Sequence, residues 1–251
     1  MRSLILPTVA LALLALTVRA DEKKSDLDEK ALAIVKQVGA LHKNAKSMHT
    51  EGTFTSDIEG ENGKRQMKVD AVVDVEKPNH FAIRTKLDGD SKAGPDLVCD
   101  GKKLYVHAKK LKQYTEDDAA DMPAIGGTLL QYGKANTGIL FQNVLADDPY
   151  EALMEGVTKC TYAGKEKVDG EETHHLKFEQ PSLNWELWVA TGDKPYVLKV
   201  LSVLEDGSGN KVSTVETYKN WKVDAAPGKD TFTFTPDGEA KKVKEIRSAN
   251  D

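Results

Sequence analysis

Two adjacent histidines, His174 and His175, are the residues of this sequence whose types best suit chemistry. Imidazole rings serve as metal ligands and as general acids or bases. The pair lies in a strand-like stretch, where adjacent residues point to opposite faces, so the two rings do not bind one metal together. We expect His174 on the inner face with Leu176 and Phe178, and His175 on the wet face with Lys177. We interpret them as one core and one surface histidine.

The acidic clusters do not have the spacing of a cation-binding loop. Calcium loops place oxygen ligands at alternate positions, whereas these acids are adjacent and lie at expected turns or helix starts. The clusters are Glu116-Asp117-Asp118, Asp147-Asp148 and Glu171-Glu172. The sequence also lacks Gly-x-Ser-x-Gly, His-Glu-x-x-His, Cys-x-x-Cys and phosphate-loop motifs. We therefore predict no catalytic residue, no metal, no cofactor and no enzymatic activity.

Two cysteines, Cys99 and Cys160, complete the set of reactive side chains. Each lies in an expected strand, and neither has a histidine or second cysteine at metal-ligand spacing. In an oxidising compartment a pair of cysteines can form a disulfide. A disulfide and two separately buried thiols are both consistent with the sequence.

The N-terminus has the pattern of an export signal. Leu4 to Val18 is almost wholly apolar and follows Arg2, and Val18-Arg19-Ala20 places small residues at the cleavage positions before Asp21. The apolar stretch is shorter than the roughly 20 residues of a comfortable bilayer span. We expect residues 1–20 to be a cleaved signal peptide, with a retained anchor as the alternative.

The charge of the mature chain argues against nucleic-acid binding. Removing residues 1–20 takes away two arginines and no acids, so the net charge changes from −5 to −7. An acidic chain repels phosphate backbones. No later apolar run is long enough to predict a transmembrane span in the mature chain. We expect a periplasmic protein, with secretion as the alternative.

A long amphipathic helix is predicted at the start of the mature chain. Asp26 is expected to cap it, with Glu29 three residues later. One apolar stripe recurs at helical spacing, through Leu27, Ala31, Ile34, Val35, Val38, Leu41, Ala45 and Met48. Such a helix must lie on an apolar surface.

Strands with a period of two make up most of the remaining sequence. Asp100-Gly101 and Asp169-Gly170 are hairpin signals. The alternation stops over about 117–156, where Pro149 favours a helix start and a helical lid insertion is expected. Phe232 and Phe234 are expected in the last strand. The expected strands are 50–58, 67–75, 81–87, 97–99, 103–107, 112–115, 158–168, 173–178, 184–190, 196–204 and 211–221.

These elements predict a mainly β (α+β) fold in one domain, residues 21–251. The architecture is a large curved antiparallel sheet, or half-open β-barrel, capped by the N-terminal helix and the insertion. A few helices need not fill the concavity, so we expect an apolar ligand pocket there. The expected lining residues share the inner alternation: Phe54, Val69, Phe81, Ile83, Phe178, Trp185 and Leu187. Trp185 and Trp188, three apart on a strand, are expected on opposite faces.

Several spaced pieces of this sequence resemble a family of predicted periplasmic proteins. The resemblance covers most of residues 27–236. The pieces are Lys77-Pro78, Asp100-Gly101-Lys102, Asp148-Pro149-Tyr150, Gly164, Val168-Asp169-Gly170, His174-His175-Leu176, Trp185, Trp188 and Gly192-Asp193-Lys194-Pro195. That family is similar to the fold of the lipoprotein localisation factor and of outer-membrane lipoprotein-sorting proteins. The resemblance implies an incomplete β-barrel with helices over an apolar cavity, and no catalytic residues.

Three functional hypotheses follow from the sequence. The first is a binding protein that carries or senses a lipid, a lipoprotein acyl chain or another apolar small molecule. The second is a non-catalytic structural or interaction module of the cell envelope with a protein partner. The third and weakest is a hydrolase or metalloprotein that uses His174 or His175 with acids brought in by the fold.

Overall fold

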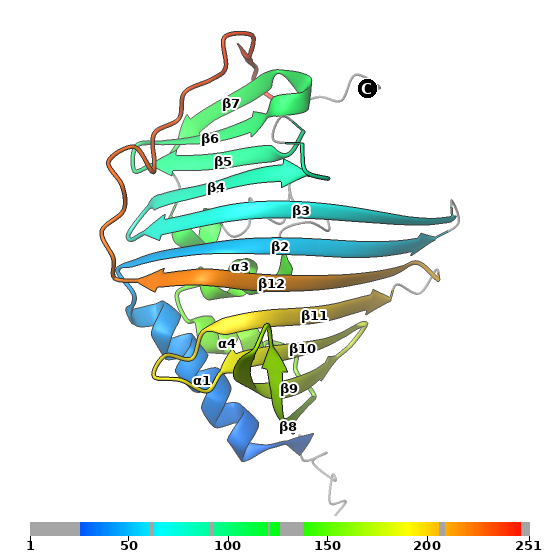
Figure 1. Cartoon of the computed structure of the whole chain (residues 1–251). Coiled ribbons are helices and arrows are strands. Elements are labelled where there is room, and N and C mark those ends of the chain that lie inside the picture. The colour runs from blue at the N-terminus through cyan, green and yellow to red at the C-terminus, as the bar shows by residue number, and fades with distance from the viewer. Residues whose placement is uncertain are drawn as a thin grey trace, which may run out of the picture.

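A computed structural model describes residues 26–60, 63–90, 93–119, 121–125, 138–205 and 209–246. These residues form a single 13-stranded sheet in the order β1-β8-β9-β10-β11-β12-β2-β3-β4-β5-β6-β7-β13 (Figure 1). Neighbouring strands are antiparallel except at the two ends, where β1 pairs with β8 and β13 with β7 in parallel. The expected large curved antiparallel sheet is confirmed.

The elements follow the order that the sequence predicts, a helix, a block of strands, a helical segment and a second block of strands. The helices are α1 (Glu29–Asn44), the 3₁₀ helix η1 (Lys109–Leu111), α3 (Gly138–Val144) and α4 (Pro149–Met154), and residues 122–125 are also helical. The first strands are β1 (Asp26–Leu27), β2 (Ser47–Gly60), β3 (Gly63–Glu76), β4 (His80–Leu87), β5 (Pro95–Asp100), β6 (Lys103–Ala108) and β7 (Gln113–Asp118). The later strands are β8 (Lys159–Val168), β9 (Glu171–Gln180), β10 (Leu183–Ala190), β11 (Val197–Glu205), β12 (Lys211–Val223) and β13 (Lys241–Lys242).

Helix α1 begins two residues later than the sequence suggested. Asp28, not Asp26, is the N-cap, and its carboxylate accepts hydrogen bonds from the backbone N–H groups of Lys30 (2.8 Å) and Ala31 (3.1 Å). Asp26 instead pairs in β1 with β8. The helix also ends at Asn44, so the predicted extension through Met48 is wrong. Met48 is already in β2. It is nevertheless buried, as the helical pattern predicted, because β2 and α1 both direct their apolar side chains into the same core.

Turn chemistry sets the hairpin between β8 and β9. Asp169 and Gly170 both have positive φ, 50° and 89°. Two consecutive positive φ angles are the backbone of the turn that matches the twist of antiparallel strands, and glycine adopts the second without steric cost. The predicted hairpin at Asp169-Gly170 is confirmed, with Val168 paired to Glu171.

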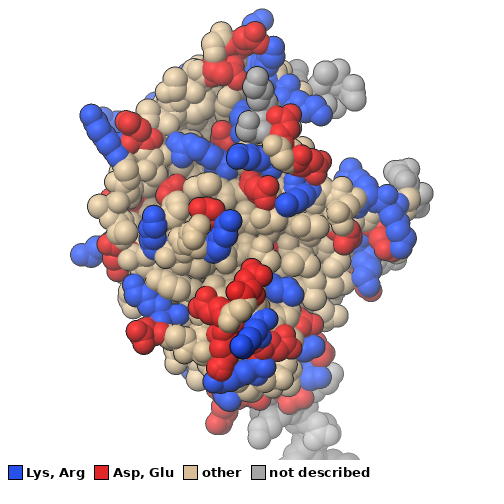
Figure 2. Space-filling model, in the orientation of Figure 1, with Lys and Arg blue, Asp and Glu red and all other residues tan. Residues whose placement is uncertain are grey.

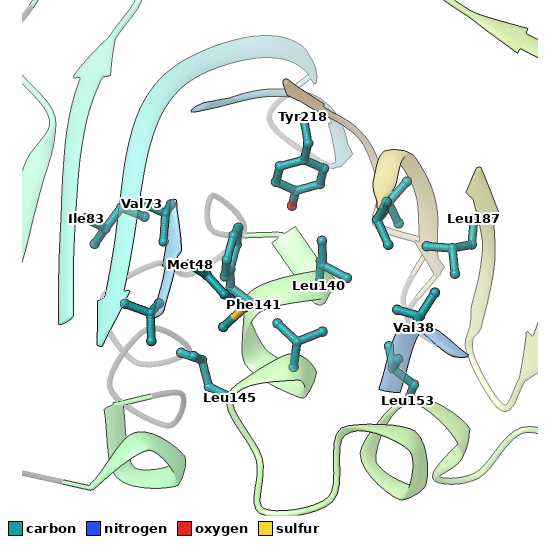
Figure 3. Packing of buried hydrophobic residues seen from close by; sticks show 14 of the residues in the cluster. Val38, Met48, Val73, Ile83, Leu140, Phe141, Leu145, Leu153, Leu187 and Tyr218 are labelled. Atoms are coloured by element: carbon teal, nitrogen blue, oxygen red, sulfur yellow. The ribbon is translucent and has the colours of Figure 1, made fainter. Parts of the chain in front are cut away.

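One core lies between the inner face of the sheet and the helices. Figure 3 shows Tyr218 and Leu187 on the arched sheet, with Leu140 and Phe141 of α3 beneath the arch. Helix α4 packs so closely on α1 that a Cβ on Gly39 would lie 2.8 Å from the Cβ of Tyr150. Glycine at this position therefore lets the two helices approach and cover the sheet together.

The segment after β12 is not a strand where one was predicted. Phe232 and Phe234 lie in an irregular strap that crosses strands β4 to β7. Phe234 stacks on Tyr105 (centroids 4.6 Å apart), and the guanidinium of Arg84 donates to the carbonyl of Thr231 (2.8 Å). The alternation of Phe232 and Phe234 predicted a strand. Their rings hold the segment on the sheet instead, and its backbone forms no strand pairing over residues 224–240.

The opposite, convex face of the sheet is charged. Figure 2 shows basic and acidic side chains interspersed over the face seen in Figure 1. Many of these charges are paired across strands, as in Lys177–Glu186 (3.4 Å) and Lys159–Glu179 (3.0 Å). Hydration of one face and burial of the other explain the clean alternation of the sequence.

Truncating a large side chain of the concave face should cost far more stability than truncating an exposed one. We expect Phe54→Ala to lower the free energy of unfolding by about 3–5 kcal/mol, because Phe54 is 1% exposed and leaves a cavity. Leu204→Ala, at 49% exposure, is the control and should cost less than about 1 kcal/mol. Urea unfolding measures both, and equal losses would contradict this account of the core.

Candidate functional site

The seven residues predicted to line a pocket all lie in the core of the concave face. None is more than 6% exposed, and Phe54, Phe81, Phe178 and Leu187 are among the largest fully buried side chains. In this structure they pack in one cluster with side chains of α1, α3 and α4. The other three predicted residues, Val69, Ile83 and Trp185, belong to the same cluster. Whether a ligand contacts these residues remains a prediction.

Two of the seven residues also border an open cavity of about 430 Å³. Phe178 and Trp185 line it, and their rings stack with centroids 3.7 Å apart. The other lining residues, among them Leu201 and Val203 of β11 with Lys177, Glu179 and Glu186, alternate onto the convex face, so this cavity is not the one predicted within the concave face. Trp185 and Trp188 lie on opposite faces of β10, as predicted, because Trp185 stacks on Phe178 and Trp188 on His175.

A glutamate lies at the centre of the concave face. Glu216 is on β12, opposite Phe54 of β2 on one side and Val200 of β11 on the other. Its side chain is 0% exposed and points to the start of α3. Oε1 accepts a hydrogen bond from the backbone N–H of Ile139 (2.8 Å), and the hydroxyl of Tyr218 donates to Oε2. The carboxylate therefore joins the sheet to the lid helix α3.

Burial raises the pKa values of both Glu216 and Tyr218. Removal from water raises the pKa of Glu216 from 4.5 to about 7, although hydrogen bonds from Tyr218, Ile139 and Leu140 act in the opposite direction. Burial, together with the adjacent carboxylate, raises the pKa of Tyr218 well above 10. Tyr218 therefore keeps its proton and acts as a hydrogen-bond donor to Glu216.

Aromatic rings surround this polar pair. Tyr218 makes edge-to-face contacts with Phe54 (5.9 Å between centroids) and with Phe141 of α3 (5.7 Å). Phe141 also stacks on Trp221 at 6.4 Å. The side chain of Phe141 thus inserts between rings of the sheet, and Figure 3 shows it beneath the Tyr218 hydroxyl. We call Glu216, Tyr218, Trp221, Phe54 and Phe141 the Glu216 cluster.

A buried histidine of α1 borders the Glu216 cluster. His42 is 0% exposed and lies edge-to-face with Trp221 at 5.8 Å. Its Nδ1 is 2.9 Å from the carbonyl of Val38, which can only accept, so Nδ1 carries the proton. Its Nε2 is then an acceptor, and it has no hydrogen-bond partner among the described residues. Burial lowers the pKa of His42 from 6.5 to about 4, so the ring stays neutral.

The predicted histidine pair is divided between the two faces, as expected. His174 accepts or donates one hydrogen bond with the hydroxyl of Tyr162 (3.1 Å) and is half-buried. His175 is on the convex face, but the prediction that it is a surface residue is wrong, because it is only 5% exposed. Trp188 covers its ring at 4.2 Å, since both side chains leave paired strands on the same face.

Two carboxylates hold His175 in place. Its Nδ1 is 3.0 Å from Glu166 and its Nε2 is 2.5 Å from Glu186. Glu166 also accepts from the indole N–H of Trp188 (2.9 Å). This arrangement satisfies every polar atom of the ring, which favours a structural role. Within the described ranges, no three His, Cys, Asp or Glu side chains form a set of metal ligands.

The two cysteines are buried on opposite wings of the sheet. Cys99 is on β5 and Cys160 on β8, with seven strands between them in the sheet order. This separation leaves two separately buried thiols as the alternative that fits the fold. Burial raises the pKa of Cys160 to about 12, so this thiol is not a nucleophile at neutral pH.

Sequence reasoning did not identify the Glu216 cluster. The signal that could have found it is a carboxylate in an inward position of a strand, since Thr214, Glu216 and Tyr218 alternate with exposed or half-buried residues. An acid in such a position must find donors from another element. The backbone donors are on α3, which the sequence predicted only as part of the helical lid insertion.

Two sequence comparisons find relatives of this chain. Residues 31–245 match the model of a family described as "Predicted periplasmic protein (DUF2092)". The uncharacterized protein MJ0687 of Methanocaldococcus jannaschii is 27% identical over 211 residues, which are 83% of this chain and 52% of that protein. The chain thus spans about half the length of this curated relative. None of the described helices is long and apolar enough to cross a membrane.

Solved structures with low sequence identity are similar over most of their length. The lipoprotein LppX of Mycobacterium tuberculosis is 17% identical with a TM-score of 0.40, over 77% of this chain and 96% of that chain. The LolA superfamily protein NE2245 of Nitrosomonas europaea is 13% identical with a TM-score of 0.34, over 80% and 96%. LprF of Mycobacterium bovis is 13% identical with a TM-score of 0.36, over 85% and 99%.

The Glu216 carboxyl should make stability depend on pH. Its pKa is raised in the folded state, so its contribution is fully present below about pH 4.5 and is lost as pH rises through about 7. We expect the free energy of unfolding of the wild type, relative to Glu216→Gln, to fall over this range by up to about 1.4 kcal/mol per pH unit. Urea unfolding across the range measures this difference.

Comparing the wild type with Glu216→Gln isolates the contribution of Glu216 to the pH dependence of stability. His42 has a lowered pKa, which changes stability with pH in the opposite direction, but it is present in both proteins and its contribution cancels. Glu205→Gln, on the neighbouring strand β11 and exposed, is the matched control. A wild-type to Glu216→Gln difference that is constant with pH would contradict a raised pKa at Glu216.

Proposed function

Because the chain belongs to the DUF2092 family of predicted periplasmic proteins, we propose that it is an exported binding protein that carries or senses an apolar ligand within its half-barrel. The ligand is a lipid, a lipoprotein acyl chain or another apolar small molecule. Residues 1–20 are the signal peptide in this proposal, and 21–251 are the mature domain. Export to the periplasm follows, and no enzymatic activity, metal or cofactor is part of the proposal.

The observation that carries this proposal is how the concave face is covered. Its apolar side chains come from the whole width of the sheet, yet the described part of the lid contains only short helices, among them α3 and α4 of 7 and 6 residues. Helices this short have little stability of their own and depend on the surface beneath them. A ligand that offers the same apolar contacts can therefore replace them.

An acyl chain matches the chemistry of this face. Each methylene moved out of water contributes about 0.8 kcal/mol, and no special residue is needed for such binding. The proposed contact residues are the seven inner residues Phe54, Val69, Phe81, Ile83, Phe178, Trp185 and Leu187. In this arrangement the ligand takes the positions of Leu140 and Phe141 and moves α3 away from the sheet.

A second candidate function is a structural or interaction module of the envelope with a protein partner. The packing of side chains of α1, α3 and α4 against the inner face favours this function. A filled interior needs no ligand for stability. In this alternative the charged convex face or a sheet edge makes the functional contact.

Native mass spectrometry of the protein purified from its own exported compartment tests the first candidate. We expect a chain that begins at Asp21 and carries an additional mass that organic extraction identifies as a lipid. A protein without bound mass that also takes up no apolar probe would contradict the carrier function and favour the interaction module.

Weakening the lid provides an independent test. Phe141→Ala removes the ring that α3 inserts into the Glu216 cluster, so opening the lid should cost less. We expect the affinity for a neutral apolar probe to rise about tenfold, since the binding-competent state becomes more populated. Val72→Ala, on the convex side of β3 and 38% exposed, is the control. Unchanged affinity in Phe141→Ala would contradict ligand entry beneath α3.

A further inference from the structure

We propose that the ligand carries a hydrogen-bond-donating head group, a hydroxyl or an ammonium, and that this head group binds the carboxylate of Glu216. The inference rests on the proposed function, because it assigns the chemistry of the ligand that the half-barrel would hold. It concerns the part of the ligand that apolar packing alone does not select.

Glu216 needs donors whether the lid is closed or open. In the closed state its donors are the backbone N–H groups of Ile139 and Leu140 and the hydroxyl of Tyr218. Two of these three donors are on α3 and leave with it. A carboxyl group that loses its partners within an apolar surface carries a large desolvation cost. A ligand in the place of α3 must supply donors to avoid this cost.

A second buried acceptor lies near the same position. The Nε2 atom of His42 accepts no hydrogen bond from the described residues, and its ring contacts Trp221, which in turn contacts Phe141. A head group that replaces Phe141 would therefore enter a region with acceptors at Glu216 and His42. The hydroxyl of Tyr218 is already committed to Glu216.

The charges around Glu216 disfavour an anionic head group. Among the described residues, the groups that affect the Glu216 carboxyl are Tyr218 and the backbone of Ile139 and Leu140, with no lysine or arginine. The ammonium of Lys77, which borders His42, donates to the backbone carbonyls of His42 and Lys43 at the end of α1. A carboxylate or phosphate head would thus meet acceptors without a cation, whereas a hydroxyl or ammonium would be bound.

Three amphiphiles with the same chain and different heads test this inference. The mature protein is equilibrated with phosphatidylcholine vesicles that contain hexadecanol, hexadecylamine or hexadecanoate, then separated and extracted to quantify the bound compound. We expect hexadecanol and hexadecylamine to bind at least about tenfold more tightly than hexadecanoate, the ratio for one hydrogen bond to a charged group.

Variants locate the preference at Glu216. In Glu216→Gln the preference for hexadecylamine over hexadecanoate should fall about tenfold, while Glu205→Gln, the exposed control on β11, should keep it. Circular dichroism checks that each variant is folded, and if Glu216→Gln does not fold, the wild-type ranking decides alone.

Each result has a distinct meaning. Equal binding of the three compounds, a preference for hexadecanoate, or a preference that survives in Glu216→Gln would overturn the head-group assignment and leave the carrier function standing. Binding of none of the three compounds would contradict the carrier function itself.

Discussion

Burial of the concave face of the sheet by helices is the interaction on which the rest of this structure depends. The inner residues of the long central strands, such as Phe54 on β2 and Val73 on β3, are apolar and would be exposed without α1, α3 and α4. Because the sheet curves, side chains from strands distant in its order converge on the same helices (Figure 3). Removing apolar area from water is the largest stabilising term in folding. The capping of α1 by Asp28 and the approach of α4 at Gly39 both serve to cover this face.

Polar groups within that apolar face define its chemistry. Glu216 and His42 are both fully buried, and burial, which disfavours the charged form of each group, moves their pKa values in opposite directions, to about 7 and about 4. The hydrogen bonds of Glu216 also give α3 a fixed position, which apolar contacts alone do not provide. On the convex face, His175 is also buried but has a carboxylate at each ring nitrogen. The buried polar atoms of Glu216 thus depend on a donor from α3, whereas those of His175 depend on side chains of the sheet.

Most of the fold could be predicted because strand alternation and turn chemistry are local signals. The alternation of Val69, Ala71, Val73 and Val75 matches their burial, and the Asp169-Gly170 turn has the required backbone. Predictions failed where a tertiary contact overrides the local signal. The path of the strap that holds Phe234 is set by ring contacts with Tyr105 and Tyr114 and not by pairing with a neighbouring strand.

The sequence by itself determined the mainly β half-barrel, its inner and outer faces and the apolar residues of its core, because periods of two and of 3.6 residues report directly on burial. Only the tertiary structure decided which polar groups are buried with them. Glu216 and the backbone of Ile139 are 77 residues apart in the chain, so no local pattern records their hydrogen bond. Likewise, Trp188 buries His175 because β9 and β10 pair in a particular register. Burial of a polar side chain is set by the partners that the complete fold brings to it.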